Sequence, residues 1–303
     1  MKQPNFFIVG APKCGTTALF QYLSEHPNVF ACEPKEPHYF ATDIPGMRTI
    51  NTEKTYFDLF KDATEQHIAI GDASVFYMYS KDAVGHIKHL DPHAKLIVML
   101  RHPVELVHSM HSQVVYSRDE HETDFEKAWA LIPQRKQGEA LSKLTRDAKT
   151  LMYDEIAKLG EQLERVLNTF PKEQVMVIFF EDFKKDTAGI YKKTLEFLGL
   201  PFHAANLDPV NQNKKQRLQW LADFTERPPQ VLVKPYLQLK KVLGLEGKEV
   251  GLREPLQKVN VVEVNRETLS TTMQQKIIDT YRTDIQKLAT LTGRNLDHWL
   301  VVT

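Results

Sequence analysis

A short apolar run that ends in glycine, followed by a helix-forming stretch, constrains this chain more than any other feature. Phe6-Phe7-Ile8-Val9 predicts a buried strand that ends at Gly10, and residues 16–25 predict a helix. The loop between them is only a few residues long. A strand, a tight loop and a helix in this order are typical of the first unit of a nucleotide-binding α/β domain.

Similar apolar runs recur further along the chain. Residues 68–70, 95–100 and 174–180 predict further buried strands, and helical patterns such as residues 149–170 lie between them. Strands that alternate with helices form parallel sheets. We therefore expect an α/β fold in which helices flank a P-loop-type parallel β-sheet.

The rest of the chain has a different pattern. Residues from Gln212 onward are mostly helical in pattern and end in a predicted helix over 270–291, without an internal repeat or a low-complexity linker. We therefore expect one domain over residues 1–303, with a nucleotide-binding α/β core (1–205) and a mainly helical C-terminal extension (206–303).

Composition limits the classes of protein to consider. With 303 residues, of which 42% are hydrophobic and 26% charged, the chain can bury a large core. The 39 basic and 39 acidic residues balance, so no overall field favours nucleic acid or an acidic membrane, and any anion site must be local.

Cysteine usage and the first apolar run bear on the location of the protein in the cell. Two cysteines cannot supply a disulfide framework for a chain of this length. Because Pro12 and Lys13 interrupt the first apolar run, that run is too short for a signal peptide or a membrane span. We expect a soluble, cytoplasmic protein, and the sequence leaves its oligomeric state open.

The loop after the first strand has the spacing of a phosphate-binding loop. Gly10 and Gly15 are separated by four residues, and Thr17 ends the pattern, but Thr16 stands where nucleotide triphosphatases carry lysine. The lysine is at position 13 instead. Backbone amides of such a loop hold a phosphate, and a lysine inside the loop can lie over a 5′-phosphate and the bond to its leaving group.

With Ala18 and Leu19, this loop resembles the 5′-phosphosulfate loop of sulfotransferases that use 3′-phosphoadenosine 5′-phosphosulfate (PAPS). In that family a strand ends in arginine, and a serine eight residues later helps to bind the 3′-phosphate. Arg101 and Ser109 have this spacing, and a guanidinium can bind phosphate through two hydrogen bonds. The resemblance implies that PAPS is the sulfuryl donor and that its binding residues are Lys13, Cys14, Gly15, Thr16, Thr17, Arg101 and Ser109.

Later segments extend the resemblance over most of the chain. Residues 175–198 resemble the family's later strand and helix, and residues 295–299 resemble the C-terminus of many bacterial members. Residues 212–217 resemble a segment near the nucleotide, which makes Arg217 a candidate phosphate contact. Phe180 stands where cytosolic members often carry an aromatic residue against adenine, but an aromatic at the end of a buried strand is more often core.

Glu36-Pro37-His38 resembles the Glu-x-His segment of glycosaminoglycan-type sulfotransferases, in which the glutamate is the base. Cytosolic relatives use histidine. We therefore expect Glu36 to be the general base and His38 its partner or substitute, and we leave open which of the two takes the proton. Lys35 is a candidate for steering an anionic acceptor.

Other positions depart from both subgroups. Asp72 stands where glycosaminoglycan enzymes carry lysine, which weakens the case for a sulfated polysaccharide acceptor. Asp72 can position the acceptor or Lys13, or cap the next helix. The basic glycine-rich loop of cytosolic phenol and steroid enzymes is missing, as is the cysteine pair of the Golgi group. Because it has the Glu36-Pro37-His38 segment, the chain resembles the glycosaminoglycan type more than the cytosolic phenol and steroid group.

Two histidine pairs, His86/His89 and His108/His111, have the helical spacing that metal ligands can share. No further ligands lie at suitable spacing. The resemblance also implies a reaction without a metal, so we expect no metal site.

The expected activity is transfer of the sulfuryl group from PAPS to an acceptor hydroxyl or amine by in-line displacement, which releases adenosine 3′,5′-bisphosphate. The acceptor can be a small molecule, a lipid, a saccharide or a carrier-bound group, and residues 42–56 and 116–144 are expected to face it. A P-loop small-molecule kinase is one alternative, although the position of Lys13 argues against it. A nonenzymatic nucleotide-binding protein is the other.

Overall fold

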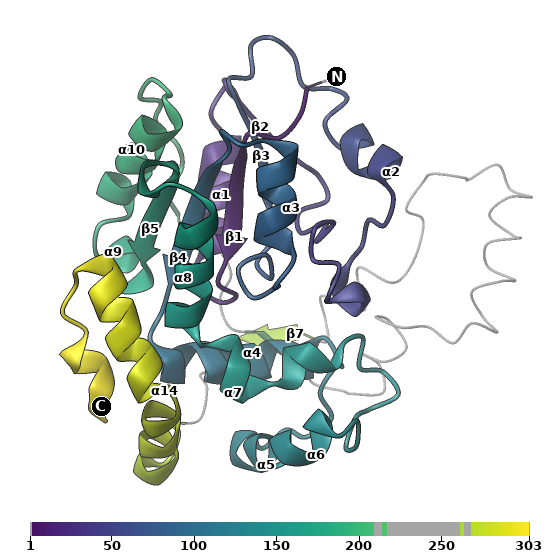
Figure 1. Ribbon diagram of the computed structural model, residues 1–303, viewed down its shortest axis with the longest axis vertical. Coiled ribbons are helices and arrows are strands. Elements are labelled where there is room, and N and C mark those ends of the chain that lie inside the picture. Colours follow the sequence, from purple (N-terminus) through teal and green to yellow (C-terminus); the bar gives the residue numbers. More distant parts are fainter. Residues whose placement is uncertain (1, 209–213, 217–260, 264–267, 303) are drawn as a thin grey trace, which may run out of the picture.

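The computed structural model describes residues 2–208, 214–216, 261–263 and 268–302 (Figure 1). Five parallel strands form one sheet in the order β2-β3-β1-β4-β5. The strands are β1 (Phe6–Gly10), β2 (Val29–Ala31), β3 (Ala69–Ala73), β4 (Lys95–Leu100) and β5 (Val175–Phe179). The predicted α/β fold with a parallel sheet is confirmed.

The central strand β1 is buried along its whole length. Phe6 pairs with Gly71 of β3 on one side and with Lys95 of β4 on the other. A Cβ atom at Gly71 would lie 2.1 Å from the Phe6 ring, so glycine at this position makes room for the ring. Apolar strands with both faces covered are typical of parallel sheets.

Helices cover both faces of the sheet (Figure 1). Helices α1 (Thr16–Ser24) and α10 (Thr187–Leu198) pack together on one face, and α3 (Ala83–Leu90) and α8 (Leu159–Thr169) pack together on the other. The long helix α14 (Thr271–Thr292) lies along α8. The remaining helices are α2 (Glu53–Asp58), α4 (Pro103–Tyr116), α5 (Phe125–Ala130), α6 (Ile132–Lys136), α7 (Tyr153–Ile156) and α9 (Phe180–Lys185), with 3₁₀ turns η1 (Pro45–Met47), η2 (Ala148–Leu151), η3 (Lys172–Gln174) and η4 (Asp297–Leu300).

The helical pattern over residues 149–170 corresponds to three separate elements, η2, α7 and α8. The start of α8 is fixed from a distant part of the chain. The backbone amides of Gly160 and Glu161 donate to the Asp284 carboxylate of α14, at 2.7 and 2.8 Å. A cap supplied across more than 120 residues leaves no local signal for the break.

The described part of the predicted C-terminal extension is helical except for one short strand pair. Strand β6 (Lys214–Gln216) pairs antiparallel with β7 (Val261–Glu263). After α14, Trp299 of η4 is buried and lies edge-on to Phe179, with ring centroids 5.8 Å apart. The C-terminus thus packs against the sheet, while the division at residue 205 stays a prediction. No helix in the described ranges is long and apolar enough to cross a membrane.

Strand order places a ligand crevice between β1 and β4. The chain leaves β1 toward the β2-β3 side of the sheet, and it leaves β4 toward β5. Where successive connections diverge in this way, the loops at the carboxyl ends of the two strands open a crevice in which α/β proteins bind ligands. The loop that contains Lys13 follows β1, and Arg101 follows β4.

Candidate active site

The structure directly connects the predicted phosphate-binding loop and the arginine that follows β4. Arg101 donates from Nη1 to the backbone carbonyl oxygen of Lys13 at 2.8 Å. Gly15 ends the loop with a φ of +86°, and a Cβ atom there would lie 3.0 Å from the Phe180 ring. Glycine is therefore required at position 15 both for its backbone conformation and for this close approach.

Helix α4 carries two polar residues, one turn apart, that bear on this site. Ser109, the predicted 3′-phosphate residue, is buried. One turn later, Gln113 accepts a hydrogen bond from Lys13 Nζ through Oε1 at 3.0 Å. The sequence analysis missed Gln113, although its spacing of four residues from Ser109 puts both on one helix face.

The other predicted loop residues divide by exposure. Thr16 is buried at the start of α1, and Thr17 is half-buried. Cys14 is buried, and its burial raises the pKa of the thiol to about 12. A cysteine with this pKa is a neutral thiol at physiological pH, so it contributes its backbone and its small volume rather than a thiolate.

Arg101 has an acidic partner in this structure. Its Nε and Nη2 atoms both lie 2.8 Å from Oε2 of Glu105, one turn along the chain. Its guanidinium also lies over the ring of Phe180, 4.6 Å from the centroid. Phe180 is half-buried: it packs against the core and also borders a small pocket together with Arg101.

The three predicted catalytic residues share an uncommon backbone conformation. Lys13, Glu36 and His38 have φ values of 63°, 64° and 50°. Residues other than glycine rarely have a positive φ, and those that do are concentrated at functional sites. Contacts with the rest of the protein must therefore hold these loops in a backbone conformation that is unfavourable for the residues themselves.

Glu36 is held between a lysine and a histidine. Its Oε1 lies 2.6 Å from Lys35 Nζ, and its Oε2 lies 3.4 Å from His38 Nε2. Burial opposes ionisation, but the contacts with His38 and Lys35 outweigh it and lower the pKa of Glu36 to about 2. The Glu36 side chain is 36% exposed and that of His38 only 2%, so an acceptor can reach the carboxylate but not the imidazole.

Asp72 has a structural position that the sequence analysis did not foresee. It is fully buried and accepts hydrogen bonds from the hydroxyls of Tyr56, Ser74 and Tyr77, at 2.9, 2.8 and 2.7 Å. Burial raises its pKa, against the effect of the three hydroxyl donors. Asp72 therefore neither caps the next helix nor is open to an acceptor.

Ser74 links the Glu36 loop to the central strand. Its Oγ accepts from the backbone amide of His38 at 3.1 Å while donating to Asp72, and its own amide donates to the Ile8 carbonyl of β1 at 3.1 Å. The loop that carries the predicted base is thus anchored at the same edge of the sheet as the phosphate loop.

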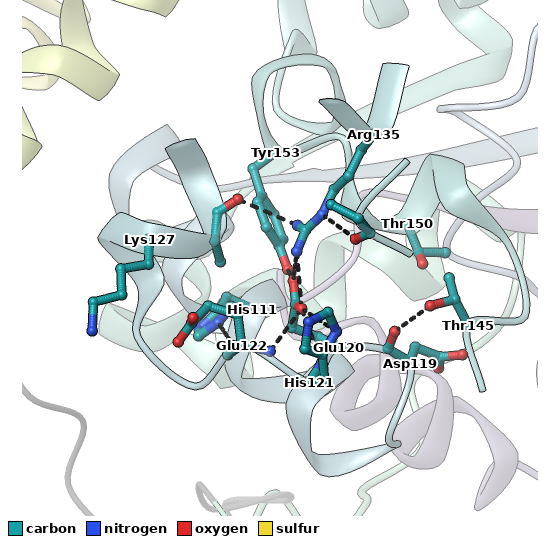
Figure 2. A network of polar contacts seen from close by, with 12 residues as sticks. His111, Asp119, Glu120, His121, Glu122, Lys127, Arg135, Thr145, Thr150 and Tyr153 are labelled. Atoms are coloured by element: carbon teal, nitrogen blue, oxygen red, sulfur yellow. Dashed lines mark hydrogen bonds and ion pairs between the residues drawn. The ribbon is translucent and has the colours of Figure 1, made fainter. Parts of the chain in front are cut away.

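The segment after α4 folds around a buried ion pair (Figure 2). Glu120 and Arg135 both have fully buried side chains and lie 2.7 Å apart. The hydroxyl of Tyr153 donates to Glu120 at 3.0 Å, and His111 of α4 lies 2.8 Å from the Glu122 carbonyl. This network fixes residues 117–156, which include most of the segment 116–144 expected to face the acceptor, against the helix that carries Ser109 and Gln113.

Two further predictions concern metals and Arg217. The described residues contain no group of three or more histidine, cysteine, aspartate or glutamate side chains suited to a metal ion. Arg217 lies outside the described residues, as do residues 212 and 213, whereas Lys214–Gln216 form β6.

Comparison with known proteins shows the family to which the chain belongs. The family model described as "Sulfotransferase domain" matches residues 3–227. The chain belongs to the sulfotransferase family. A solved bacterial sulfotransferase, from Alicyclobacillus acidocaldarius, is 26% identical with a TM-score of 0.69, and the match covers 99% of both chains.

Two curated relatives of this sulfotransferase chain come from mouse. Carbohydrate sulfotransferase 15 is 26% identical over 278 residues, with 74% of this chain and 48% of the relative covered. Heparan sulfate glucosamine 3-O-sulfotransferase 3A1 is 28% identical over 202 residues, with 65% and 46% covered. The chain spans about half the length of the curated relatives it matches.

Proposed function

We propose that this protein transfers the sulfuryl group of PAPS to an acceptor by in-line displacement and releases adenosine 3′,5′-bisphosphate. The observation that carries the proposal is the hydrogen bond from Arg101 to the Lys13 carbonyl, which brings two cationic positions together at the carboxyl ends of β1 and β4. A nucleotide with phosphates at both its 5′ and 3′ positions needs two such positions, whereas AMP needs one. Membership of the sulfotransferase family supports this reading.

The residues divide into two binding groups. The backbone of Cys14 and Gly15 and the hydroxyls of Thr16 and Thr17 would hold the 5′-phosphosulfate at the start of α1. Arg101 and Ser109 would hold the 3′-phosphate. Lys13 would neutralise the charge that grows on the bridging oxygen as the bond from sulfur to that oxygen breaks.

Glu36 is the proposed base. The acceptor oxygen forms the new bond to sulfur, its proton passes to Glu36, and the bonding electrons of the broken bond stay on the departing 5′-phosphate. Glu36 is the reachable partner of the pair, because His38 is almost fully buried behind it. We assign His38 to holding the carboxylate and Lys35 to keeping it ionised.

For the acceptor we propose a saccharide hydroxyl, ahead of small-molecule, lipid and carrier-bound acceptors. The support is that relatives carry the names carbohydrate sulfotransferase and heparan sulfate glucosamine 3-O-sulfotransferase. Because Asp72 is fully buried, it supplies no contact in place of the lysine of glycosaminoglycan enzymes. A neutral saccharide is therefore the first acceptor to test. The cytoplasmic location stays a prediction from the sequence.

The test is a calorimetric titration with adenosine 3′,5′-bisphosphate, AMP and ATP. We expect the wild type to bind the bisphosphate at least about tenfold more tightly than AMP, since a charge-assisted arginine contact to phosphate is strong. Arg101→Ala and Ser109→Ala should reduce this preference. Ser112→Ala is the matched control, because Ser112 is on the same helix with its hydroxyl bonded to the His108 carbonyl.

Two results would overturn the proposal. One is ATP binding that equals or exceeds bisphosphate binding and is unaffected by Arg101→Ala, which would favour the small-molecule kinase. The other is tight bisphosphate binding without transfer to any of a broad panel of acceptors, which would favour a nonenzymatic nucleotide-binding protein.

A further inference from the structure

A small pocket next to the Arg101 position contains a second cation that the proposed function does not use. Arg101, His102 and Glu105 line it from the β4–α4 side, and Phe180, Glu181 and Lys184 line it from α9. The C-terminal Trp299 closes one side. Two elements that are 80 residues apart in the chain thus bring an arginine and a lysine to one pocket.

Phe180 contacts both the phosphate loop and the two cations. Its ring lies against Gly15 of the loop, where a Cβ atom would lie 3.0 Å from the ring. The Arg101 guanidinium lies 4.6 Å and the Lys184 ammonium 5.8 Å from the centre of the same ring. A lysine has a flexible four-carbon stem, so its ammonium can move toward an anion bound at Arg101.

The acidic neighbours of Lys184 already have another cationic partner. Arg294, just after α14, donates to Glu181 at 2.7 Å and to Asp182 at 2.9 Å. Lys184 makes no ion pair within 4.0 Å to a carboxylate of the described residues. Its charge therefore remains available to a ligand in the pocket, whereas the charge of Arg101 is shared with Glu105.

A phosphate monoester carries between one and two negative charges at neutral pH. Arg101 alone, with Glu105 beside it, leaves part of that charge unbalanced. We propose that Lys184 is the second cation of the 3′-phosphate pocket and that it sets, with Arg101, the preference for a 3′-phosphorylated nucleotide. This inference rests on the proposed function.

The experiment compares two adjacent lysines of α9. Calorimetric titrations with adenosine 3′,5′-bisphosphate and with AMP are made on the wild type, Lys184→Ala, Lys184→Arg and Lys185→Ala. Lys185 is the matched control, because it is also exposed on α9 but does not line the pocket. All variants change only exposed side chains, and thermal melting verifies that each is folded.

We expect Lys184→Ala to weaken bisphosphate binding about five- to twentyfold and to leave AMP binding unchanged, because only the bisphosphate has a 3′-phosphate. Lys184→Arg should keep most of the affinity, and Lys185→Ala should stay within about twofold of the wild type. Equal losses in Lys184→Ala and Lys185→Ala, or an equal loss for AMP, would overturn the assignment of Lys184 while leaving the proposed function intact. A wild type that binds AMP as tightly as the bisphosphate would overturn both.

Discussion

Arg101 and Lys13, 88 residues apart in the chain, are joined by a 2.8 Å hydrogen bond from the guanidinium to the lysine carbonyl. The arginine that is assigned to one end of the nucleotide therefore also supports the backbone of the loop assigned to the other end. Since Lys13 has a positive φ, this contact helps to hold a conformation that the residue would not choose alone.

Replacing Lys13 by alanine should abolish turnover. The lysine is placed to neutralise charge on the departing phosphate, and removing one such group typically lowers kcat by about 10²- to 10³-fold. Steady-state rates with PAPS and an accepted saccharide measure this, and bisphosphate titration shows whether the site is still formed. A folded Lys13→Ala variant with near-wild-type turnover would show that Lys13 is not part of the chemistry.

Gln113→Ala should lower kcat about tenfold, because Lys13 loses the amide oxygen that orients its ammonium group. The effect should fall on kcat more than on the KM for PAPS, since Gln113 is not assigned to the nucleotide itself. Gln113→Glu should be slower still, because a carboxylate would hold the ammonium away from the phosphate. Unchanged kcat in both variants would contradict this role.

Glu105→Gln should tighten bisphosphate binding about two- to fivefold. The Glu105 carboxylate takes two donors of Arg101 that a phosphate would otherwise use, and an exposed pair of this kind is worth about 0–1 kcal/mol. Titrations at low and high salt measure the effect, which should shrink as salt screens the pair. Weaker binding at low salt would mean that Glu105 positions Arg101 rather than competing for it.

The pH dependence of kcat/KM should change in Lys35→Ala. In the wild type, the pKa of Glu36 is lowered to about 2 from an ordinary value of 4.5, so the carboxylate stays ionised at pH 5–8 and its protonation limits nothing there. Removing Lys35 removes a contact that lowers this pKa, so the pKa rises and activity should begin to fall at a higher pH on the acid side. A pH profile with the same acid limb as the wild type would refute this.

Arg135→Met should destabilise the fold by about 3–5 kcal/mol, because it leaves the Glu120 carboxylate buried without its cation. Urea unfolding measures the loss. Adding Glu120→Gln should restore part of it, since the buried charge is then gone. Arg282→Met, which breaks an exposed pair with Asp279, should cost less than about 1 kcal/mol. Equal losses in the two single variants would contradict the special position of the buried pair.

Much of the nucleotide side was predictable from the sequence, because its signals are local. The runs at residues 6–10 and 95–100 became β1 and β4. The loop spacing and the eight-residue interval from Arg101 to Ser109 likewise depend on neighbours in the chain.

Three features that the sequence did not indicate depend on contacts between residues that are distant in the chain. The three hydroxyls around Asp72 come from positions 56, 74 and 77, and no spacing rule joins them. Phe180 has the pattern of a core residue, yet Gly15 and Arg101 place its ring at the edge of a pocket. The break before α8 depends on Asp284.

The Asp284 cap also has a consequence for the order of events during synthesis. Residues 1–205 leave the ribosome well before α14 has been synthesised. At that stage the amides of Gly160 and Glu161 do not yet have the Asp284 carboxylate as hydrogen-bond acceptor. The same delay applies to Asp182 and Glu181, which wait for Arg294. The sheet can assemble early, but its outer helices reach their final arrangement only when almost the whole polypeptide has been made.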